Sequence, residues 1–202
     1  MHISEGVLAA PLLITGAAGA IAGCGIGLKK MDLEKTPKVA VMSSVFFVAS
    51  LIHIPLGPTS AHLMLNGLAG IILGWSSFPA LFVALLLQVI LFQFGGITTL
   101  GVNTMVMALP ALASFYLFAG FIRGKSNTRA TVAAFIAGIT AMFSSGLLVA
   151  FCLIFTGRQF LNVARVFILA HTPVMIIEGV LTALIVGFLR KVRPALLGGI
   201  AQ

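Results

Sequence analysis

The first two residues carry the most distinctive metal-binding chemistry in this sequence. His2 directly follows Met1, and because methionine aminopeptidases remove Met only before small side chains, we expect Met1 to stay. The Met1 amine, the His2 amide nitrogen and the His2 imidazole Nδ1 can then close two fused chelate rings on one ion. Three nitrogens in a plane, with the amide deprotonated, suit Ni²⁺ and Cu²⁺, and Co²⁺ less well. A histidine at position two also occurs by chance, and many such chelates are incidental.

A fourth nitrogen would come from one of two histidines beside a turn-rich segment. His62 follows residues 55–60 (PLGPTS), which cannot continue a helix. We expect His62 to open the next membrane span on the side that holds Met1, which makes it the better candidate ligand. His53 lies just before the break, where it either donates a hydrogen bond to a ligand or is an interfacial residue.

The other ionisable residues of the apolar segments leave two interpretations open. His171 and Glu178 are seven residues apart, on one helical face, and either form an internal hydrogen-bonded pair, with Arg165 nearby, or lie near a substrate. Glu5 either favours the positive end of the first helix, with Ser4 as its cap, or offsets the charge of a bound cation. The candidates for the surroundings of the metal are His53, Ser60, Glu5, His171 and Glu178.

The composition places these residues in a membrane protein. The chain has 202 residues, 60% of them hydrophobic and 8% charged, with a mean hydropathy of +1.18. Such a chain lacks the polar surface of a water-soluble globule. A net charge of +8 would suggest nucleic acid as the partner of a soluble domain, but the hydropathy excludes that partner here.

Neither sulfur nor carboxylate ligation fits this composition. Cys24 and Cys152 stand alone in apolar runs, without the paired spacing of a thiolate site or a disulfide framework. Only four residues are Asp or Glu, and Asp32 and Glu34 share a loop, which leaves too few carboxylates for a Ca²⁺ cage. The scarcity of acids therefore favours a transition metal held by nitrogen.

Seven apolar runs are taken as membrane spans, since a crossing helix needs roughly 20 mainly apolar residues. They are residues 7–28, 39–54, 61–73, 79–94, 102–122, 130–155 and 162–189. The sequence thus predicts an all-α membrane protein, a single integral membrane domain over residues 1–202. Ten of the twelve Lys and Arg follow the first, fifth and seventh runs, so the positive-inside rule predicts an external amino terminus and a cytoplasmic carboxyl terminus.

Two features of the first span bear on its role. Residues 1–7 include Glu5 and no basic residue, unlike a secretory signal, so we expect them to remain on the protein. Gly19, Gly23 and Gly27 form a stripe of small residues that lets another helix approach closely. That helix belongs either to this chain or to a partner.

No enzymatic motif is convincing. Residues 119–126 (AGFIRGKS) approach a phosphate-binding loop, but the first glycine is missing and the segment closes a membrane span instead of joining a strand to a helix. Any ATP hydrolysis should therefore occur on separate polypeptides. Ser60 near His62 raises the alternative of an intramembrane hydrolase, which has weak support without an oxyanion device. We expect a protein that is not an enzyme.

Four segments together carry a family likeness. They are residues 1–6 (MHISEG), 54–67 (IPLGPTSAHLMLNG), 95–104 (GGITTLGVNT) and 170–182 (AHTPVMIIEGVLT). Over nearly its whole length the chain resembles the nickel and cobalt substrate-capture subunits of energy-coupling-factor transporters. The resemblance implies that the amino-terminal segment enters the bundle from outside, and that metal is held by the Met1 amine, the His2 backbone and side chain, and His62.

The resemblance also implies a cargo and partners. The cargo is Ni²⁺ or Co²⁺, taken up with high affinity and without an organic cofactor; some relatives supply cobalt for cobalamin synthesis. The partners are a transmembrane coupling subunit, two cytoplasmic ABC ATPase subunits and often a small accessory membrane subunit, in a bacterial or archaeal cell (inner) membrane. Many relatives carry His where this chain has Phe94, which leaves the metal preference open. The alternative is an organic vitamin as cargo on a similar scaffold.

Overall fold

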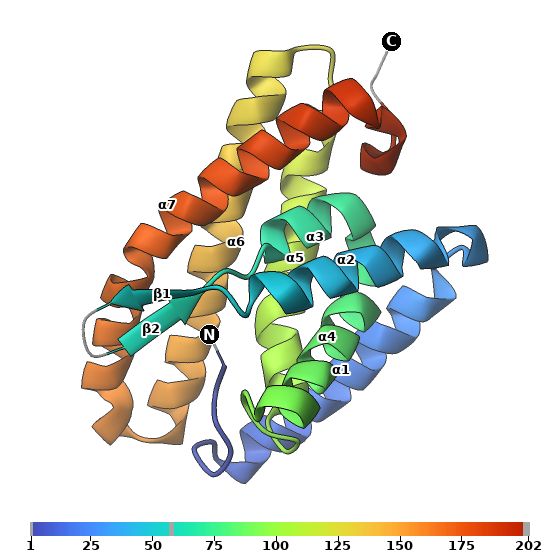
Figure 1. Cartoon of the computed structure of the whole chain (residues 1–202). Coiled ribbons are helices and arrows are strands. Elements are labelled where there is room, and N and C mark those ends of the chain that lie inside the picture. Colours follow the sequence, from blue (N-terminus) through green and yellow to red (C-terminus); the bar gives the residue numbers. More distant parts are fainter. Residues whose placement is uncertain (1, 57–58, 200–202) are drawn as a thin grey trace.

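This computed structural model describes residues 2–56 and 59–199. These residues contain seven α-helices and one β-hairpin. The helices are α1 (Ala10–Lys29), α2 (Thr36–Ala49), α3 (Asn66–Leu73), α4 (Ser77–Phe92), α5 (Leu100–Arg123), α6 (Asn127–Thr156) and α7 (Leu161–Val192). The strands are β1 (His53–Leu56) and β2 (Thr59–His62), which pair antiparallel. Figure 1 shows the short helix α3 surrounded by longer ones, and its residues Asn66 to Ile72 are all buried.

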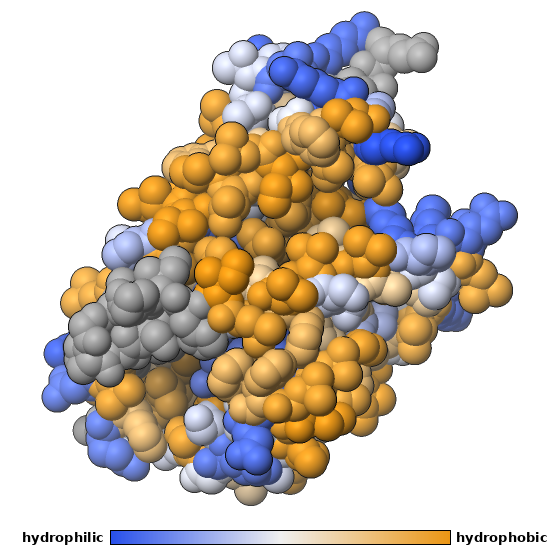
Figure 2. Space-filling view, viewed as in Figure 1, coloured by the Kyte–Doolittle hydropathy of each residue, from blue (hydrophilic) through white to orange (hydrophobic). Residues whose placement is uncertain are grey.

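Five helical stretches of the described residues are long and apolar enough to cross a membrane. They are Ala10–Lys29, Asn66–Phe92, Leu100–Arg123, Asn127–Thr156 and His171–Val192. The second of these combines α3 and α4 across the short turn Gly74–Ser76. Figure 2 shows a broad apolar face with hydrophilic residues gathered toward its ends. The prediction of an α-helical, multi-pass membrane protein is confirmed, whereas seven crossings and the sides of the two termini stay predictions.

The predicted second and third spans are wrong where they meet. We expected one helix to run to Ile54 and the next to begin at Ala61, but α2 ends at Ala49 and α3 begins at Asn66. The residues between them form the hairpin, in which His53 pairs with His62. Pro55 and the turn residues after it cannot continue a helix, and strand pairing satisfies the backbone groups that a broken helix would expose inside a bilayer.

The other five predicted spans match helices whose ends differ from the prediction by at most three residues. His62 therefore does not open a helix, as we expected, but ends a strand. The chain then turns through Leu65, whose φ of 51° is left-handed, before α3 begins. This change of direction separates His62 from the helix and turns the strand end toward the interior.

The glycine stripe of α1 packs within the chain. A Cβ at Gly19 would meet the Met105 side chain of α5 at 2.8 Å, and one at Gly23 would meet the Phe78 ring of α4 at 2.3 Å. A Cβ at Gly27 would lie 2.6 Å from the backbone oxygen of Trp75. The small residues thus let α1 lie directly on α4 and α5. The helices that pack on the glycine stripe therefore belong to this chain.

The basic end of the bundle is held together by arginine side chains that bind backbone carbonyl groups. The buried Arg190 guanidinium of α7 donates to the carbonyl groups of Ile122 and Gly124, where α5 ends. Arg123 donates to the Leu197 carbonyl at 2.7 Å. These bonds supply donors to carbonyls that the last turn of a helix leaves without partners.

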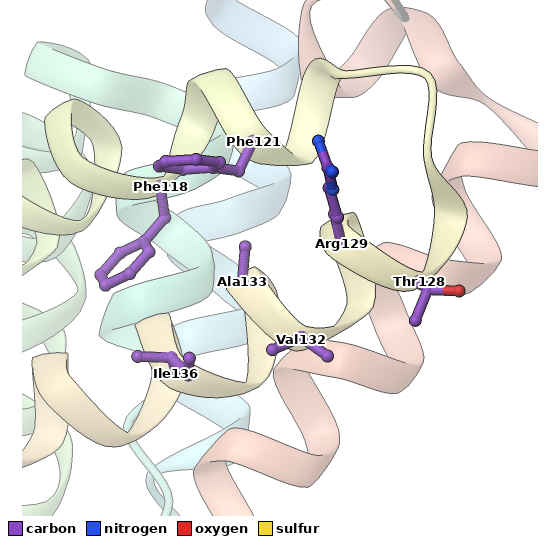
Figure 3. Close-up of a pocket in the computed structure, with 7 residues that line it drawn as sticks. All are labelled: Phe118, Phe121, Thr128, Arg129, Val132, Ala133 and Ile136. Atoms are coloured by element: carbon purple, nitrogen blue, oxygen red, sulfur yellow. The ribbon is translucent and has the colours of Figure 1, made fainter.

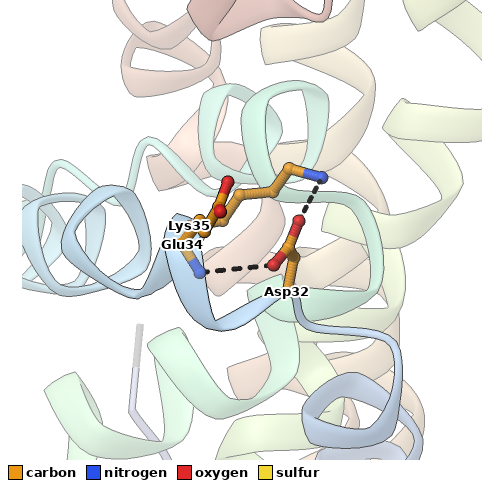
Figure 4. A network of polar contacts seen from close by, with 3 residues as sticks. All are labelled: Asp32, Glu34 and Lys35. Atoms are coloured by element: carbon orange, nitrogen blue, oxygen red, sulfur yellow. Dashed lines mark hydrogen bonds and ion pairs between the residues drawn. The ribbon is translucent and has the colours of Figure 1, made fainter.

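The loop before α2 is ordered by a small exposed network (Figure 4). Asp32 accepts a hydrogen bond from the Glu34 N–H at 3.3 Å and pairs with the Lys35 ammonium at 3.6 Å. Because both members of this ion pair are exposed, it contributes little stability. The Asp32 carboxylate therefore serves the loop, through the Glu34 backbone and the Lys35 side chain.

Candidate metal centre

The amino-terminal segment is anchored inside the bundle by polar side chains of α5 and the turn before it. The buried Ile3 donates its N–H to Asn103 Oδ1 at 3.0 Å, and Asn103 Nδ2 donates back to the Ile3 carbonyl at 3.1 Å. Thr99 Oγ1 donates to the same carbonyl at 2.9 Å. Asn103 thus offers the backbone of Ile3 the donor and acceptor that a neighbouring strand would offer, and this holds His2 in place.

His2 and His62 lie against each other in the interior. Their ring centroids are 4.8 Å apart with an interplanar angle of 25°, and His62 is only 5% exposed. His2 Nδ1 and His62 Nε2 lie 3.1 Å apart. The fold therefore brings together one ring nitrogen from each of two residues that are 60 positions apart in the sequence.

The hydrogen bonds of the outer ring nitrogens set the tautomers of the pair. His2 Nε2 lies 2.6 Å from Gln88 Oε1, and His62 Nδ1 lies 3.1 Å from the Leu63 carbonyl oxygen. Both partners are acceptors, which favours the tautomer with the proton on the outer nitrogen of each neutral ring. In that tautomer His2 Nδ1 and His62 Nε2 are the ring atoms that can bind a metal ion.

The direction of the bond between His2 and Gln88 is itself determined by a chain of donors. Gln88 Nε2 donates to Ser50 Oγ at 2.6 Å, and the Ser50 hydroxyl donates to the Phe47 carbonyl at 2.6 Å. A carbonyl only accepts, so the chain has a single polarity, and the Gln88 oxygen must face His2. Gln88 and Ser50 are wholly buried, which keeps water from offering an alternative donor.

The spacing of these two nitrogens, which suits a hydrogen bond between the rings, also fits a shared metal ion. Metal–imidazole bonds are about 2.0–2.1 Å long, so two nitrogens on one ion at a right angle lie about 2.8–3.0 Å apart. The observed 3.1 Å is close to that separation. Among the described residues no three His, Cys, Asp or Glu side chains gather as a metal cage.

Glu178 supports the histidine pair through the backbone. Its carboxylate accepts hydrogen bonds from the backbone N–H groups of Met64 and Leu65, just after His62. These bonds do not decide between the two alternatives for His171 and Glu178, an internal pair with Arg165 nearby or a place near a substrate. Because both backbone groups lie in the turn between β2 and α3, Glu178 holds the turn that directs His62.

One of the two alternatives for the amino-terminal polar residues, in which Ser4 caps the first helix, is wrong. Helix α1 begins at Ala10 and has Ala9 at its N-cap position, so Ser4 is too far away to cap it. Glu5 instead accepts the N–H of Thr98 at 3.2 Å, and a Cβ at Gly96 would meet the Glu5 side chain at 2.8 Å. Glu5 therefore ties the amino-terminal segment to the loop between α4 and α5.

The remaining predicted residues are placed only in part. His171 is buried on α7. The backbones of His53 and Ser60 lie in the hairpin, opposite His62 and Pro55, and their side chains lie outside the described part of the chain. Met1 also lies outside it. The ring of Phe94 stacks on that of His2 with centroids 6.1 Å apart, so the position where many relatives carry His is an apolar wall here.

Four polar residues of the site were missed by the sequence analysis. They are Ser50, Gln88, Thr99 and Asn103, all buried. Gln88 interrupts the apolar run ALLLQVILF, and a polar side chain in such a run is costly unless it has a buried partner. The position of Gln88 and Asn103 within apolar runs indicates that each has a buried partner, but it does not identify that partner.

A multi-pass helical protein in which a half-buried histidine of the amino-terminal segment meets a buried histidine of the hairpin has the features of a membrane metal-binding protein. The family model of the cobalt uptake substrate-specific transmembrane region matches residues 2–196, so the chain belongs to this family, CbiM. A putative metal transport protein of Haemophilus influenzae is 41% identical over 196 residues, which cover 96% of this chain and 95% of that protein. Membership places the chain among transport proteins for cobalt and nickel.

Solved structures agree with this assignment. The chain superimposes on a transition metal transporter with a TM-score of 0.78 and 27% identity, over 95% of this chain and 93% of that one. It shares its fold with the S-component for biotin from an ECF-type ABC transporter, with a TM-score of 0.57 and 20% identity over 80% of this chain and 95% of that one. The resemblance to metal-capture subunits of such transporters is confirmed.

Proposed function

We propose that this chain binds Ni²⁺ or Co²⁺ with high affinity and carries it through ATP-dependent uptake as the substrate-binding subunit of an energy-coupling-factor transporter. The single observation that carries the proposal is the 3.1 Å separation of His2 Nδ1 and His62 Nε2. Gln88 Oε1 and the Leu63 carbonyl oxygen lie beside the outer nitrogens and orient the two rings. Rings that are oriented in advance lower the cost of binding a cation.

The proposed ligand set contains four nitrogens. They are the Met1 amine, the amide nitrogen and Nδ1 of His2, and Nε2 of His62. The first three close fused rings on one ion, and His62 supplies the fourth corner. The deprotonated amide and the four-nitrogen plane favour Ni²⁺ slightly over Co²⁺.

The proposed transport cycle needs other subunits. Residues 119–126 end α5 and enter the next loop, without the strand and helix that a phosphate-binding loop requires. We therefore assign ATP hydrolysis to two cytoplasmic ABC ATPase subunits, coupled through a transmembrane subunit and often joined by a small accessory membrane subunit. The location is the cell membrane of a bacterium or archaeon.

Metal content distinguishes this ligand set from adventitious binding. Protein purified with its native amino terminus should hold one Ni²⁺ per chain by elemental analysis, and His2→Ala and His62→Ala should hold none. An extension of two residues before Met1 should also abolish binding, because it removes the amine. A single added residue is avoided, since a histidine in third position forms a four-nitrogen chelate by itself.

The matched control carries the same two residues at the carboxyl terminus and should bind as well as the unmodified protein. Undiminished metal content in the amino-terminally extended protein would refute the proposed ligand set. Thermal unfolding of each variant without metal shows whether a loss of binding is a loss of folding.

A further inference from the structure

A second recognition feature lies at the basic end of the bundle, far from the histidine pair in the fold. It is a groove of about 480 Å³ between the end of α5 and the beginning of α6. Figure 3 shows Phe118 and Phe121 on one side and Val132 and Ile136 on the other, with Ala133 between them. Its volume lies within the roughly 300–1,000 Å³ of small-molecule pockets, and its lining is almost entirely apolar.

One cation lies at the end of this groove nearest the loop. Arg129 projects from the first turn of α6 toward that loop (Figure 3). The neighbouring arginines differ from it, because Arg123 and Arg190 donate to backbone carbonyl groups. Among the described residues, the side chain of Arg129 makes no such bond. It also forms no ion pair with them, since the salt bridge of the described chain joins Lys35 and Asp32. Arg129 thus keeps its donors for another molecule and, unlike Arg193, lines the groove.

We propose that this groove binds an anionic phospholipid, with the phosphate on Arg129 and an acyl chain along Phe118, Phe121 and Ile136. Guanidinium binds phosphate through paired hydrogen bonds, and Arg129 stands where the loop leaves the apolar part of the helices, the depth at which headgroups lie. Phe121 is 62% exposed, so the groove is continuous with the lipid-facing surface. An apolar helix of a second protein would leave the arginine without a counter-charge, which is costly, whereas a phosphate supplies one.

Charge selectivity and groove dependence can be measured together. The detergent-purified protein is titrated with dioleoyl phosphatidylglycerol or dioleoyl phosphatidylcholine, and bound lipid is counted by native mass spectrometry. One basic residue near an anionic headgroup contributes about 1 kcal/mol. We therefore expect phosphatidylglycerol to bind about fivefold more tightly than phosphatidylcholine, and Arg129→Gln to remove that preference.

Two further variants separate the groove from surface charge in general. Phe121→Ala should weaken the binding of both lipids, whereas Leu117→Ala, equally exposed on the same helix but outside the groove, should not. Lys29→Gln, which removes an exposed charge at the end of α1, should leave the lipid preference intact. Equal binding of the two lipids by the unmodified protein, or a preference that survives Arg129→Gln, overturns the proposal.

Discussion

The buried hydrogen bond between Gln88 and His2 provides the sharpest test of the metal site. Replacing Gln88 with Met keeps the length of the side chain but removes both the oxygen that accepts from His2 Nε2 and the nitrogen that donates to Ser50. The proton of His2 is then no longer held on Nε2. In a fraction of molecules it moves to Nδ1, the atom that we assign to the metal, and the ring is free to rotate.

The size of the effect follows from the two hydrogen bonds that this substitution removes, each 2.6 Å long. Hydrogen-bond partners that orient a metal-binding histidine are typically worth 10–100-fold in affinity, so we expect Ni²⁺ binding by Gln88→Met to weaken by about 10–100-fold. Because Gln88 is wholly buried, the unfolding free energy should also fall, by about 1–3 kcal/mol for a buried group left without a partner. Ser50→Ala should have a smaller effect on affinity, since Gln88 itself remains.

Affinity is best measured by competition with a coloured chelator, using protein with its native amino terminus in detergent. The matched control is Gln88→Glu, which keeps an acceptor for His2 Nε2 and should retain most of the affinity. Binding by Gln88→Met that equals that of the unmodified protein would show that Gln88 does not set the His2 tautomer. Helical content by circular dichroism identifies any variant that is simply unfolded.

Two other predictions concern the segments that position the site. Asn103→Ala removes both bonds to the backbone of Ile3, so the first residues should exchange amide hydrogens faster, as measured by mass spectrometry, while the rest of the chain keeps its protection. Gly70→Ala would place a Cβ 1.8 Å from the Ala111 carbonyl oxygen and should lower the thermal midpoint, as overpacking costs at least about 1–3 kcal/mol. Gly25→Ala, where a Cβ meets nothing within 4 Å, should instead stabilise the helix slightly.

The helices could be predicted from the sequence because the bilayer imposes a simple rule. A chain that crosses the hydrocarbon core must satisfy its own backbone hydrogen bonds, so long apolar runs become helices. Five of the seven predicted runs match a helix to within three residues at both ends. The hairpin was missed because the run before residue 55 is as apolar as a helix, and strand pairing depends on a partner that lies beyond the turn.

The site could be predicted only as far as local chemistry reaches. The chelating potential of His2 follows from its place beside Met1, and the choice of His62 over His53 followed from the break before it. Gln88 and Asn103 could not be assigned their roles in this way. They act through hydrogen bonds to residues 86 and 100 positions away, and no local pattern records such a bond.

Composition, charge and the placement of two histidines were therefore sufficient to indicate a membrane protein suited to a nitrogen-ligated metal. Tertiary structure decided how those histidines meet. Packing of α4 and α5 around the amino-terminal segment brings Gln88 to His2 and Asn103 to Ile3, while Glu178 holds the turn after His62. The physical reason is that a tautomer depends on which acceptor lies about 3 Å away, and only the assembled bundle determines that.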